Sequence, residues 1–507
     1  MLEAQKRLST GFLILLSLPT AAVGFALSSG IATTTWLLST RYNLHLENIA
    51  LIWLMGPLMG LLVQPLVGAL SDRTSLMKGR RRPYLLAGGL AGAGSTYAML
   101  ELDRLASATG LSLIAVAVIV ALVADLGTNV TFNPARSLVA DLTPEGPARV
   151  RGYAWMQTVS GLLGISAYLI SIFFGNLALV LVTVAVVFFL TLLPLLFIEE
   201  TAPTAMAPPA AAPPGVADQR ATGMAAFKAL WPMVGFLVYG VFVAVDKLLF
   251  DNALAAWSVP LFVAVVLMTL LWGLAIVWQG RTRPSSQNRM GTMLVAHGFA
   301  WLGVQSMFVM GFFYVRDFVV PAASGAPLLA DALYHLANTA TAATATTAAD
   351  TAGRILSMGF LLLNLVGAAL PVLVLKPLCQ RWGKVRVHRS AVGLMAAAYA
   401  FIALAPAHEA FFYLGMLLCG IGWSSLISIV FAIYSESVDS REMGVSMGVF
   451  NASLVLPALA VPGLLKLSDT LDQHRWVFAL FAVCLLLSFA FWGAVSERES
   501  LSAGNGV

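Results

Sequence analysis

Long apolar runs alternate with short polar segments along almost the whole chain. The run at 52–70 carries no charged residue and is followed at once by a loop rich in Arg. About 20 apolar residues in an α-helix cross the hydrocarbon core of a bilayer, so each such run predicts a membrane span. The pattern as a whole indicates an all-α polytopic membrane protein.

Fourteen apolar runs of this kind are present. They lie near 11–38, 49–71, 83–100, 111–140, 152–174, 177–198, 229–250, 255–278, 292–315, 355–377, 389–406, 410–434, 444–466 and 476–495. The runs at 229–250 and 255–278 are separated by the polar turn Asp251–Asn252 and look like an inserted hairpin. The stretch 199–222 is rich in Pro and Ala, which predicts a flexible cytoplasmic linker.

These runs divide the chain into three parts. We expect an N-terminal six-helix bundle at 1–200, a linker and inserted hairpin at 201–290, and a C-terminal six-helix bundle at 291–507. Two internal repeats support the division: LSDR at 70–73 is echoed by LCQR at 378–381, and the segment from Asp141 is echoed by the segment from Glu436. Similar offsets between the copies predict two related halves.

The charged residues orient the spans. With both termini in the cytoplasm, most Lys and Arg fall on the cytoplasmic side, as the positive-inside rule requires. The Ala- and Thr-rich stretch 331–350 then falls outside the cell, where we expect a solvated connector. The net charge of +5 does not indicate a nucleic-acid partner, because the basic residues flank apolar runs. The expected location is the cell membrane, as a multi-pass protein of a bacterial inner membrane.

Cysteine usage predicts neither a disulfide framework nor a metal site. The three cysteines, Cys379, Cys419 and Cys484, are far apart and odd in number, without CxxC or Cys/His spacing. We therefore expect no metal and no cofactor.

The fourth span carries a stripe of polar side chains. At 100° per residue, Asp125, Asn129, Asn133 and Arg136 all fall within about 80° of one another on one helix face. An acid or an Arg at the centre of a span costs at least about 2.5 kcal/mol and usually faces a water-filled cavity or a partner. Asp125 and Arg136 are separated by about 16.5 Å of helix, so they do not pair with each other. Burial of a carboxyl without a cation favours its neutral form, which suits a proton carrier.

Three stretches of sequence resemble one transporter family. WLMGPLMGLLVQPLVGALSDR and the following GRRRP closely resemble the proton-coupled sucrose symporters of plants and their animal and bacterial relatives, which are of the glycoside-pentoside-hexuronide type within the major facilitator superfamily. The fourth span matches their NxxxxPxRxLxxDL pattern. The resemblance implies a major facilitator fold and symport of a disaccharide, sucrose- or maltose-like, with protons. It also implies that Asp125 couples to protons and that Arg136 binds sugar.

Other polar or aromatic side chains at membrane depth are further candidates for sugar binding. They are Asn129, Asn133, Gln64, Gln305, Trp423 and Asn451, with His297 beside them in the same class. Aromatic rings stack on sugar faces, and MGVFNASLVLPAL, which contains Asn451, resembles the eleventh span of the family. Most Trp residues in membrane proteins belong to interfacial belts, and Asn or Gln often bonds an adjacent helix, so packing is the alternative role.

The basic loop after the second span predicts a conformational latch. Asp72 can interact with the N-terminus of the following helix, and the basic side chains can meet helix C-termini or acids such as Asp141 and Glu145. The expected latch residues are Asp72, Arg73, Arg80, Arg81, Arg82 and Asp141.

Some positions depart from the family. Gly311 and Phe313 occupy positions that are acidic in typical members, only Arg316–Asp317 resembles the usual Arg-Glu pair, and Gly161 stands where an Asn is usual. The identity of the sugar and the number of protons therefore stay open.

Three other functions remain as alternatives. They are a fourteen-helix drug/proton antiporter, a non-transporting membrane sugar sensor and an integral membrane transferase. A transferase needs a cluster of carboxylates or His that the sequence does not show. We expect a monomer that is not an enzyme, with sugar, protons and the lipid bilayer as its partners.

Overall fold

The computed structural model describes residues 7–73, 76, 79–144, 147–200, 228–283, 285–322, 328–338, 347–435, 443–471 and 475–496. Helices account for its regular structure, and the described residues contain no strand beyond one isolated bridge between Leu76 and Gly79. The all-α prediction is confirmed. The chain forms two compact units, Met1–Ala212 with Phe308–Leu361 (unit 1) and Pro213–Met307 with Leu362–Val507 (unit 2).

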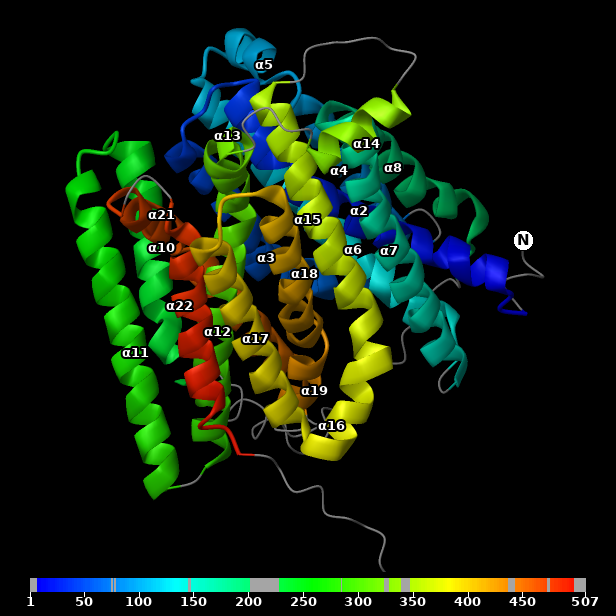
Figure 1. Cartoon of the computed structure of the whole chain (residues 1–507). Coiled ribbons are helices and arrows are strands. Elements are labelled where there is room, and N and C mark those ends of the chain that lie inside the picture. The colour runs from blue at the N-terminus through cyan, green and yellow to red at the C-terminus, as the bar shows by residue number, and fades with distance from the viewer. Residues whose placement is uncertain are drawn as a thin grey trace, which may run out of the picture. The chain divides into compact units, whose positions relative to one another are not determined.

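Unit 1 contains the whole range 1–200 that was predicted as the first bundle (Figure 1). Its helices are α2 (Thr10–Thr40), α3 (Leu46–Arg73), α4 (Arg82–Ala98), α5 (Leu102–Thr109), α6 (Leu113–Leu142), α7 (Pro147–Phe174) and α8 (Asn176–Phe197). A later stretch adds the end of α12 (Ser286–Tyr314), the π-helical η3 (Val315–Val319), α13 (Val320–Ala322), α14 (Leu329–Ala337) and the first part of α15 (Ala348–Leu370). Unit 1 therefore joins segments that lie far apart in sequence.

Unit 2 contains the remaining described helices. Its helices are η1 (Trp231–Met233), α10 (Val234–Leu249), η2 (Ala255–Trp257), α11 (Ser258–Thr282), most of α12, the end of α15, η4 (Pro371–Leu375), α16 (Lys376–Trp382), α17 (Lys384–Leu404), α18 (Glu409–Leu426), α19 (Ile429–Ser435), α20 (Met443–Ala458), α21 (Val461–Asp469) and α22 (Val477–Trp492).

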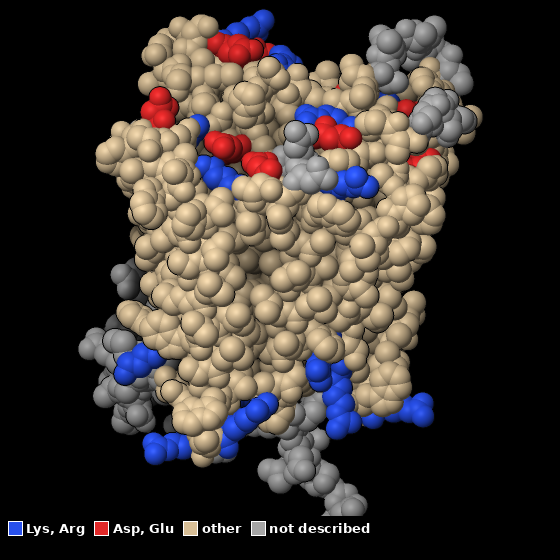
Figure 2. Space-filling view, turned by 60° about the vertical axis from the view of Figure 1, so that its left-hand side comes forward, with Lys and Arg blue, Asp and Glu red and all other residues tan. Residues whose placement is uncertain are grey.

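A helix lies in each of the fourteen predicted ranges. Ten described helices are long and apolar enough to cross a membrane, whereas α22 and the described part of α3 count as shorter apolar helices. A multi-pass membrane protein is therefore confirmed, and the count of fourteen spans stays a prediction. On the face shown in Figure 2, charged side chains gather at two ends and leave a broad band without charge between them.

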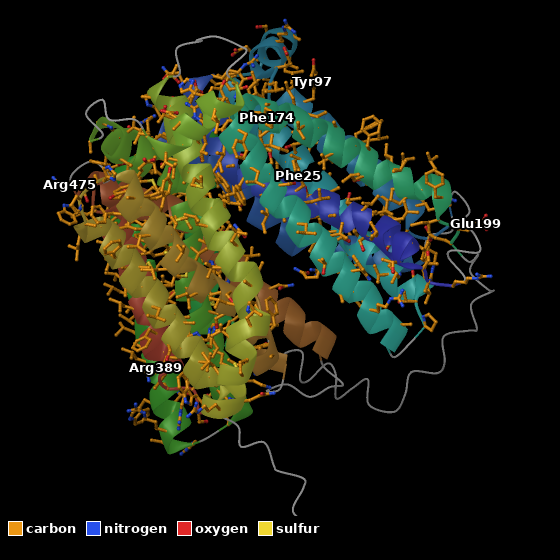
Figure 3. The ribbon with its side chains drawn as sticks, turned by 45° about the vertical axis from the view of Figure 1, so that its right-hand side comes forward. Phe25, Tyr97, Phe174, Glu199, Arg389 and Arg475 are labelled. Atoms are coloured by element: carbon orange, nitrogen blue, oxygen red, sulfur yellow. The ribbon has the colours of Figure 1, made fainter. Side chains whose placement is uncertain are left out.

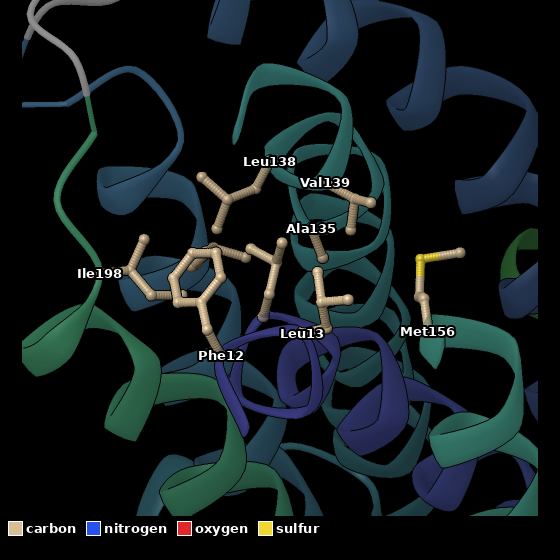
Figure 4. Close-up of a cluster of buried hydrophobic side chains, with 9 residues drawn as sticks. Phe12, Leu13, Ala135, Leu138, Val139, Met156 and Ile198 are labelled. Atoms are coloured by element: carbon tan, nitrogen blue, oxygen red, sulfur yellow. The ribbon is translucent and has the colours of Figure 1, made fainter. Parts of the chain in front are cut away.

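The helices of unit 1 begin and pack as their sequences indicate. Ser9 caps α2 by accepting the N–H of Phe12 at 3.3 Å, and Ser112 caps α6 by accepting the N–H of Ala115 at 3.3 Å. An apolar cluster joins α2, α4, α6, α7 and the residue that follows α8 (Figure 4). Its members are Phe12, Leu13, Leu16, Leu85, Ala135, Leu138, Val139, Met156 and Ile198.

Small residues bring α4 and α6 into backbone contact. A Cβ added at Gly127 of α6 would lie 2.6 Å from the backbone nitrogen of Gly92, and one added at Gly88 would lie 2.2 Å from the Thr131 hydroxyl oxygen. Only Gly permits this approach, which is a common way for membrane helices to associate. The helix with the polar stripe is thus fixed against α4.

The structure forms the inserted hairpin that the sequence predicts. Its turn residues Asp251 and Asn252 have left-handed backbones, with φ of 47° and 64°, and the Asp246 carboxylate accepts the N–H of Leu254 at 2.8 Å. The hairpin packs on α20 and α21, where a Cβ added at Gly463 would lie 2.4 Å from the Phe262 ring. The polar Asp251–Asn252 pair therefore closes a turn between two helices of unit 2.

The expected solvated connector at 331–350 is partly wrong. Residues 329–337 form α14, which packs on α7 at the end of unit 1 that also carries α5 and α13 (Figure 1). We call this the α14 end. Tyr97 and Phe174 lie at this end, and Glu199 lies at the opposite end of unit 1 (Figure 3). The Thr-rich part of the stretch follows α14, whose own sequence LADALYHLA contains no Thr and has apolar side chains at helical spacing. The prediction of a connector treated 331–350 as one segment and so missed this helix.

Candidate functional site

Asp125 lies where α6 passes a glycine of α3. A Cβ added at Gly56 would lie 3.2 Å and 3.3 Å from the two carboxylate oxygens of Asp125, so Gly56 makes room for the carboxyl group. Among the described residues no salt bridge involves Asp125. The side-chain amide of Asn129, which is 7% exposed, donates to the backbone carbonyl of Asp125 at 2.8 Å. Asp125 is therefore a partly buried acid without a cation beside it in the described structure.

Arg136 is exposed near the C-terminal end of α6, which ends at Leu142. Its guanidinium carbon lies 4.0 Å from the centre of the Phe132 ring, one turn earlier, and the Tyr153 hydroxyl of α7 donates to the Arg136 carbonyl at 3.3 Å. Asn133 lies half-buried between the two ends of the stripe. Stacking on the ring orients the guanidinium and leaves its planar donors available to a polar ligand.

The predicted site residues of the second half lie in unit 2. His297, Trp301 and Gln305 follow one another at intervals of four residues on α12, so they share one helix face. The Trp301 indole N–H donates to Nε2 of His297 at 2.9 Å, and the Gln305 amide donates to the Leu454 carbonyl of α20 at 2.9 Å.

Two more predicted residues belong to this group. Asn451 is exposed on α20, one turn before Leu454. The half-buried Trp423 of α18 packs edge to face against Trp301, with ring centres 5.9 Å apart. Unit 2 thus brings Gln305, Trp423 and Asn451 to the helices α12, α18 and α20 that pack together, and unit 1 holds the α6 stripe. Gln64 lies on α3, and its side chain is outside the described part of the chain.

The basic loop contacts Asp141 at the end of α6, as the latch prediction expects. Nε of Arg81 donates to the Asp141 carboxylate at 3.0 Å and a second guanidinium nitrogen donates to Ser71 at 2.6 Å. Arg80 lies 3.4 Å from the same carboxylate. The side chains of Asp72 and Arg73, and all of Glu145, lie outside the described residues, so their parts in the latch stay predictions.

The acid at the start of α4 is Glu200, which the sequence analysis did not single out. Its carboxylate accepts the backbone N–H groups of Arg80 at 2.6 Å, Arg81 at 2.9 Å and Arg82 at 2.9 Å. A helix N-terminus has free N–H groups and a positive dipole end, so it binds a carboxylate well. The Arg82 side chain also donates to the Leu195 carbonyl of α8. The sequence analysis had assigned the interaction with this helix N-terminus to Asp72.

A second charged network, which the sequence analysis did not predict, lies at the α14 end of unit 1. Arg354 of α15 is 2% exposed and forms an ion pair with Asp331 of α14, with Nε 2.9 Å from the carboxylate. Thr351 donates to the same carboxylate at 2.9 Å, and the Arg354 guanidinium lies 4.4 Å from the centre of the Tyr334 ring. A buried Arg is stable only when such partners satisfy it.

Neighbouring hydrogen bonds join this network to α2 and α7. The hydroxyl oxygens of Ser171 and Ser357 lie 2.7 Å apart, and the Asn338 amide donates to the Phe173 carbonyl at 2.7 Å. The Trp36 indole donates to Asp350 at 3.2 Å. Segments on either side of the predicted linker are therefore bonded to each other at this one end. An Arg just before a predicted span and an acid in the preceding loop were the signals available in the sequence.

The curated proteins that are similar to this chain include transporters of sugars. The chain is 40% identical to sucrose transport protein SUT2 of Oryza sativa subsp. indica over 114 residues, which are 20% of this chain and 23% of that protein. It is 40% identical to sucrose transport protein SUC4 of Arabidopsis thaliana over 126 residues, 23% and 25% of the two chains. It is 29% identical to the general alpha-glucoside permease of Schizosaccharomyces pombe over 135 residues, 25% and 24%. The matches thus span about a quarter of these relatives, and no family model matches the chain.

Solved structures share the fold over nearly the whole chain. The nucleoside transporter NupG superimposes with a TM-score of 0.62 at 11% identity, over 96% of this chain and 100% of that one. A POT family transporter in complex with 5-aminolevulinic acid gives a TM-score of 0.59 at 13% identity, over 96% of both chains. The chain has the fold of these membrane transporters, and the predicted resemblance to sucrose transporters is confirmed over about a quarter of the chain. All three curated relatives are named for transport, which agrees with the prediction that the chain is not an enzyme.

Proposed function

We propose that this protein is a secondary active transporter that carries a disaccharide, sucrose- or maltose-like, together with protons by alternating access of two six-helix halves. The proposal includes fourteen membrane spans, both termini in the cytoplasm of a bacterial cell and a monomeric carrier. The proposal also includes the division of the chain into a first bundle at 1–200, a linker and hairpin at 201–290, and a second bundle at 291–507. The names of the curated relatives support a sugar over the drug substrates of an antiporter or the passive role of a sensor.

The observation that carries the proposal is the environment of Asp125. Its carboxyl group lies at membrane depth on α6, against Gly56, and no described cation balances it. A carboxylate in such a place is costly, so binding a proton relieves the cost and releasing it requires access to water. A group with these two states can couple proton movement to the conformational cycle.

Arg136 supplies the complementary sugar-binding group in unit 1. Its guanidinium presents several N–H donors in one plane and is oriented by the Phe132 ring. Pairs of sugar hydroxyls match such a planar fork. Asn129 and Asn133 lie between this group and Asp125 on the same helix, so a sugar bound at Arg136 also lies along the polar stripe.

The contacts at the α14 end support the alternating-access part of the proposal. In the proposed topology this end faces outside, where the Arg354–Asp331 pair and the Ser171–Ser357 contact hold closed the route from the external solution. Charge pairs and hydrogen bonds of this kind exchange readily with water when the helices separate. The carrier therefore has a defined set of contacts to break and remake in each cycle.

Uptake into proteoliposomes tests the function. We expect radiolabelled sucrose or maltose to accumulate above its equilibrium level when the proposed external side is made acidic. Equilibration without accumulation would contradict proton coupling, and an absence of uptake for both sugars would contradict disaccharide transport. Collapse of the pH gradient by a protonophore is the control, because it removes the driving force and leaves the protein unchanged.

Substitution of Arg136 tests its role. In Arg136→Lys the charge remains but the planar pair of donors is lost, so we expect KM for the sugar to rise about tenfold, the value of one good charged hydrogen bond. The measurement is sugar exchange in vesicles, normalised to folded protein. Arg104→Lys is the matched control, because Arg104 is 83% exposed on α5 and pairs only with Glu101 among the described salt bridges. A native KM in Arg136→Lys would assign Arg136 to a packing role.

A further inference from the structure

We infer that His297 and Trp301 are positioning residues that hold the ring of Trp423 as a stacking surface for the sugar. The inference rests on the proposed sugar transport and deepens it, because it identifies the apolar face of a pyranose as what unit 2 recognises. Its basis is a chain of ring contacts that runs from α20 through α12 to α18 within unit 2.

The Trp423 ring points away from the lipid face of its helix. Phe411, Leu414 and Leu417 are 38%, 46% and 37% exposed and mark the side of α18 that meets lipid. Trp423 follows Leu414 by nine residues, which places it about 180° around the helix from that side chain. The half-buried ring therefore lies on the protein side of α18. A ring in an interfacial belt would lie on the other side.

Two neighbours fix this ring. A Cβ added at Gly367 of α15 would lie 2.8 Å from Cδ1 of Trp423, so the ring lies directly on the backbone of α15. Trp301 meets it at 5.9 Å with an angle of 70° between the ring planes. An edge-to-face pair of this kind favours one orientation of both rings.

Trp301 is itself held by a hydrogen bond. Its indole N–H donates to Nε2 of His297 at 2.9 Å, which requires a neutral imidazole whose proton is on Nδ1. His297 is fully buried and stacks on Phe450, with ring centres 4.4 Å apart and planes 23° apart. Loss of either the donor or the acceptor therefore frees Trp301 to turn, and Trp423 with it.

The polar residues near this chain of ring contacts are of a kind that binds sugars. A pyranose has one apolar face of C–H groups and a rim of hydroxyls, so it binds where an aromatic ring lies beside a few polar groups. The Gln305 amide lies one turn from Trp301 on the same face of α12, and the exposed Asn451 follows Phe450 on α20. Trp423, Gln305 and Asn451 thus lie on the three helices that these ring contacts join.

The first test removes the hydrogen bond and keeps a ring. In Trp301→Phe the indole donor is lost, and in His297→Phe the acceptor is lost while a ring remains to stack on Phe450. We expect each variant to raise KM for sucrose or maltose about fivefold, the usual net value of one neutral hydrogen bond, with Vmax unchanged. Trp272→Phe on the lipid-exposed hairpin is the control and should keep the native KM. A native KM in either test variant overturns the inference.

A double-mutant cycle shows whether Trp301 acts through Trp423. We expect Trp423→Leu to raise KM, and the addition of Trp301→Phe to that variant to raise it no further. Independent, multiplying effects would overturn the inference, because they would mean that Trp301 does not act through the ring. Uptake by the native protein is measured first. Failure of native uptake of both sugars rejects the proposed function, whereas native uptake with an unchanged KM in Trp301→Phe rejects only the positioning role.

Discussion

Asp125→Asn is expected to abolish uphill sugar accumulation and to leave sugar exchange in place. A gradient of one pH unit stores about 1.4 kcal/mol per proton, which supports about tenfold accumulation if one proton moves with each sugar. Asn has nearly the same shape as a protonated Asp but does not change charge. The accumulation ratio should therefore fall from about tenfold to about one. The measurement is proton-driven uptake beside exchange in the same proteoliposomes, normalised to folded protein.

The control for this experiment is another acid of unit 1. Asp103 is exposed on α5, far from the α6 stripe in sequence, so Asp103→Asn should leave both accumulation and exchange at native values. A purely structural role for Asp125 would lower the yield of folded protein and preserve the accumulation ratio in what remained. Full accumulation by Asp125→Asn would remove Asp125 as the coupling group, and Asp317 would become the next acid to test.

Asp331→Asn is expected to loosen the α14 end of unit 1. The change leaves the buried Arg354 without its anionic partner, and a hydrogen bond to a charged group contributes about 1.5 to 3 kcal/mol. The equilibrium between closed and open forms of this end should shift by about tenfold or more. A cysteine at position 357, whose native Ser357 is buried against Ser171, should react correspondingly faster with an impermeant maleimide added from outside.

This labelling requires a background without Cys379, Cys419 and Cys484. Asp350→Asn is the matched control, since Asp350 lies in the same segment and accepts neutral donors from Trp36 and Thr347 rather than pairing with a buried cation. Its effect on labelling should be clearly smaller. An unchanged labelling rate in Asp331→Asn would mean that the ion pair does not hold this end closed.

Local pattern predicted the helices well, because membrane spans are specified by composition over about 20 residues. The α6 stripe could be predicted for the same reason: the positions of Asp125 and Arg136 on one face follow from helix geometry alone. The hairpin turn at Asp251–Asn252 was also visible, since Asp and Asn adopt left-handed backbones more readily than most residues.

Contacts between distant segments could not be predicted. Glu200 reaches the start of α4 across more than a hundred residues, and no local pattern distinguishes it from the neighbouring Glu199. The Arg354–Asp331 pair depends on α14, a helix within a stretch whose composition suggested a connector. The ring contacts of Trp301 and Trp423 join α12 to α18, so each residue alone looked like an ordinary membrane Trp.

The backbone contact between α4 and α6 constrains how proton binding at Asp125 can affect sugar binding at Arg136 in the proposed function. Gly88, Gly92 and Gly127 bring the two backbones into contact, so we expect α6 to move together with α4. We therefore expect protonation of Asp125 to act on the proposed sugar site through a joint reorientation of α4 and α6.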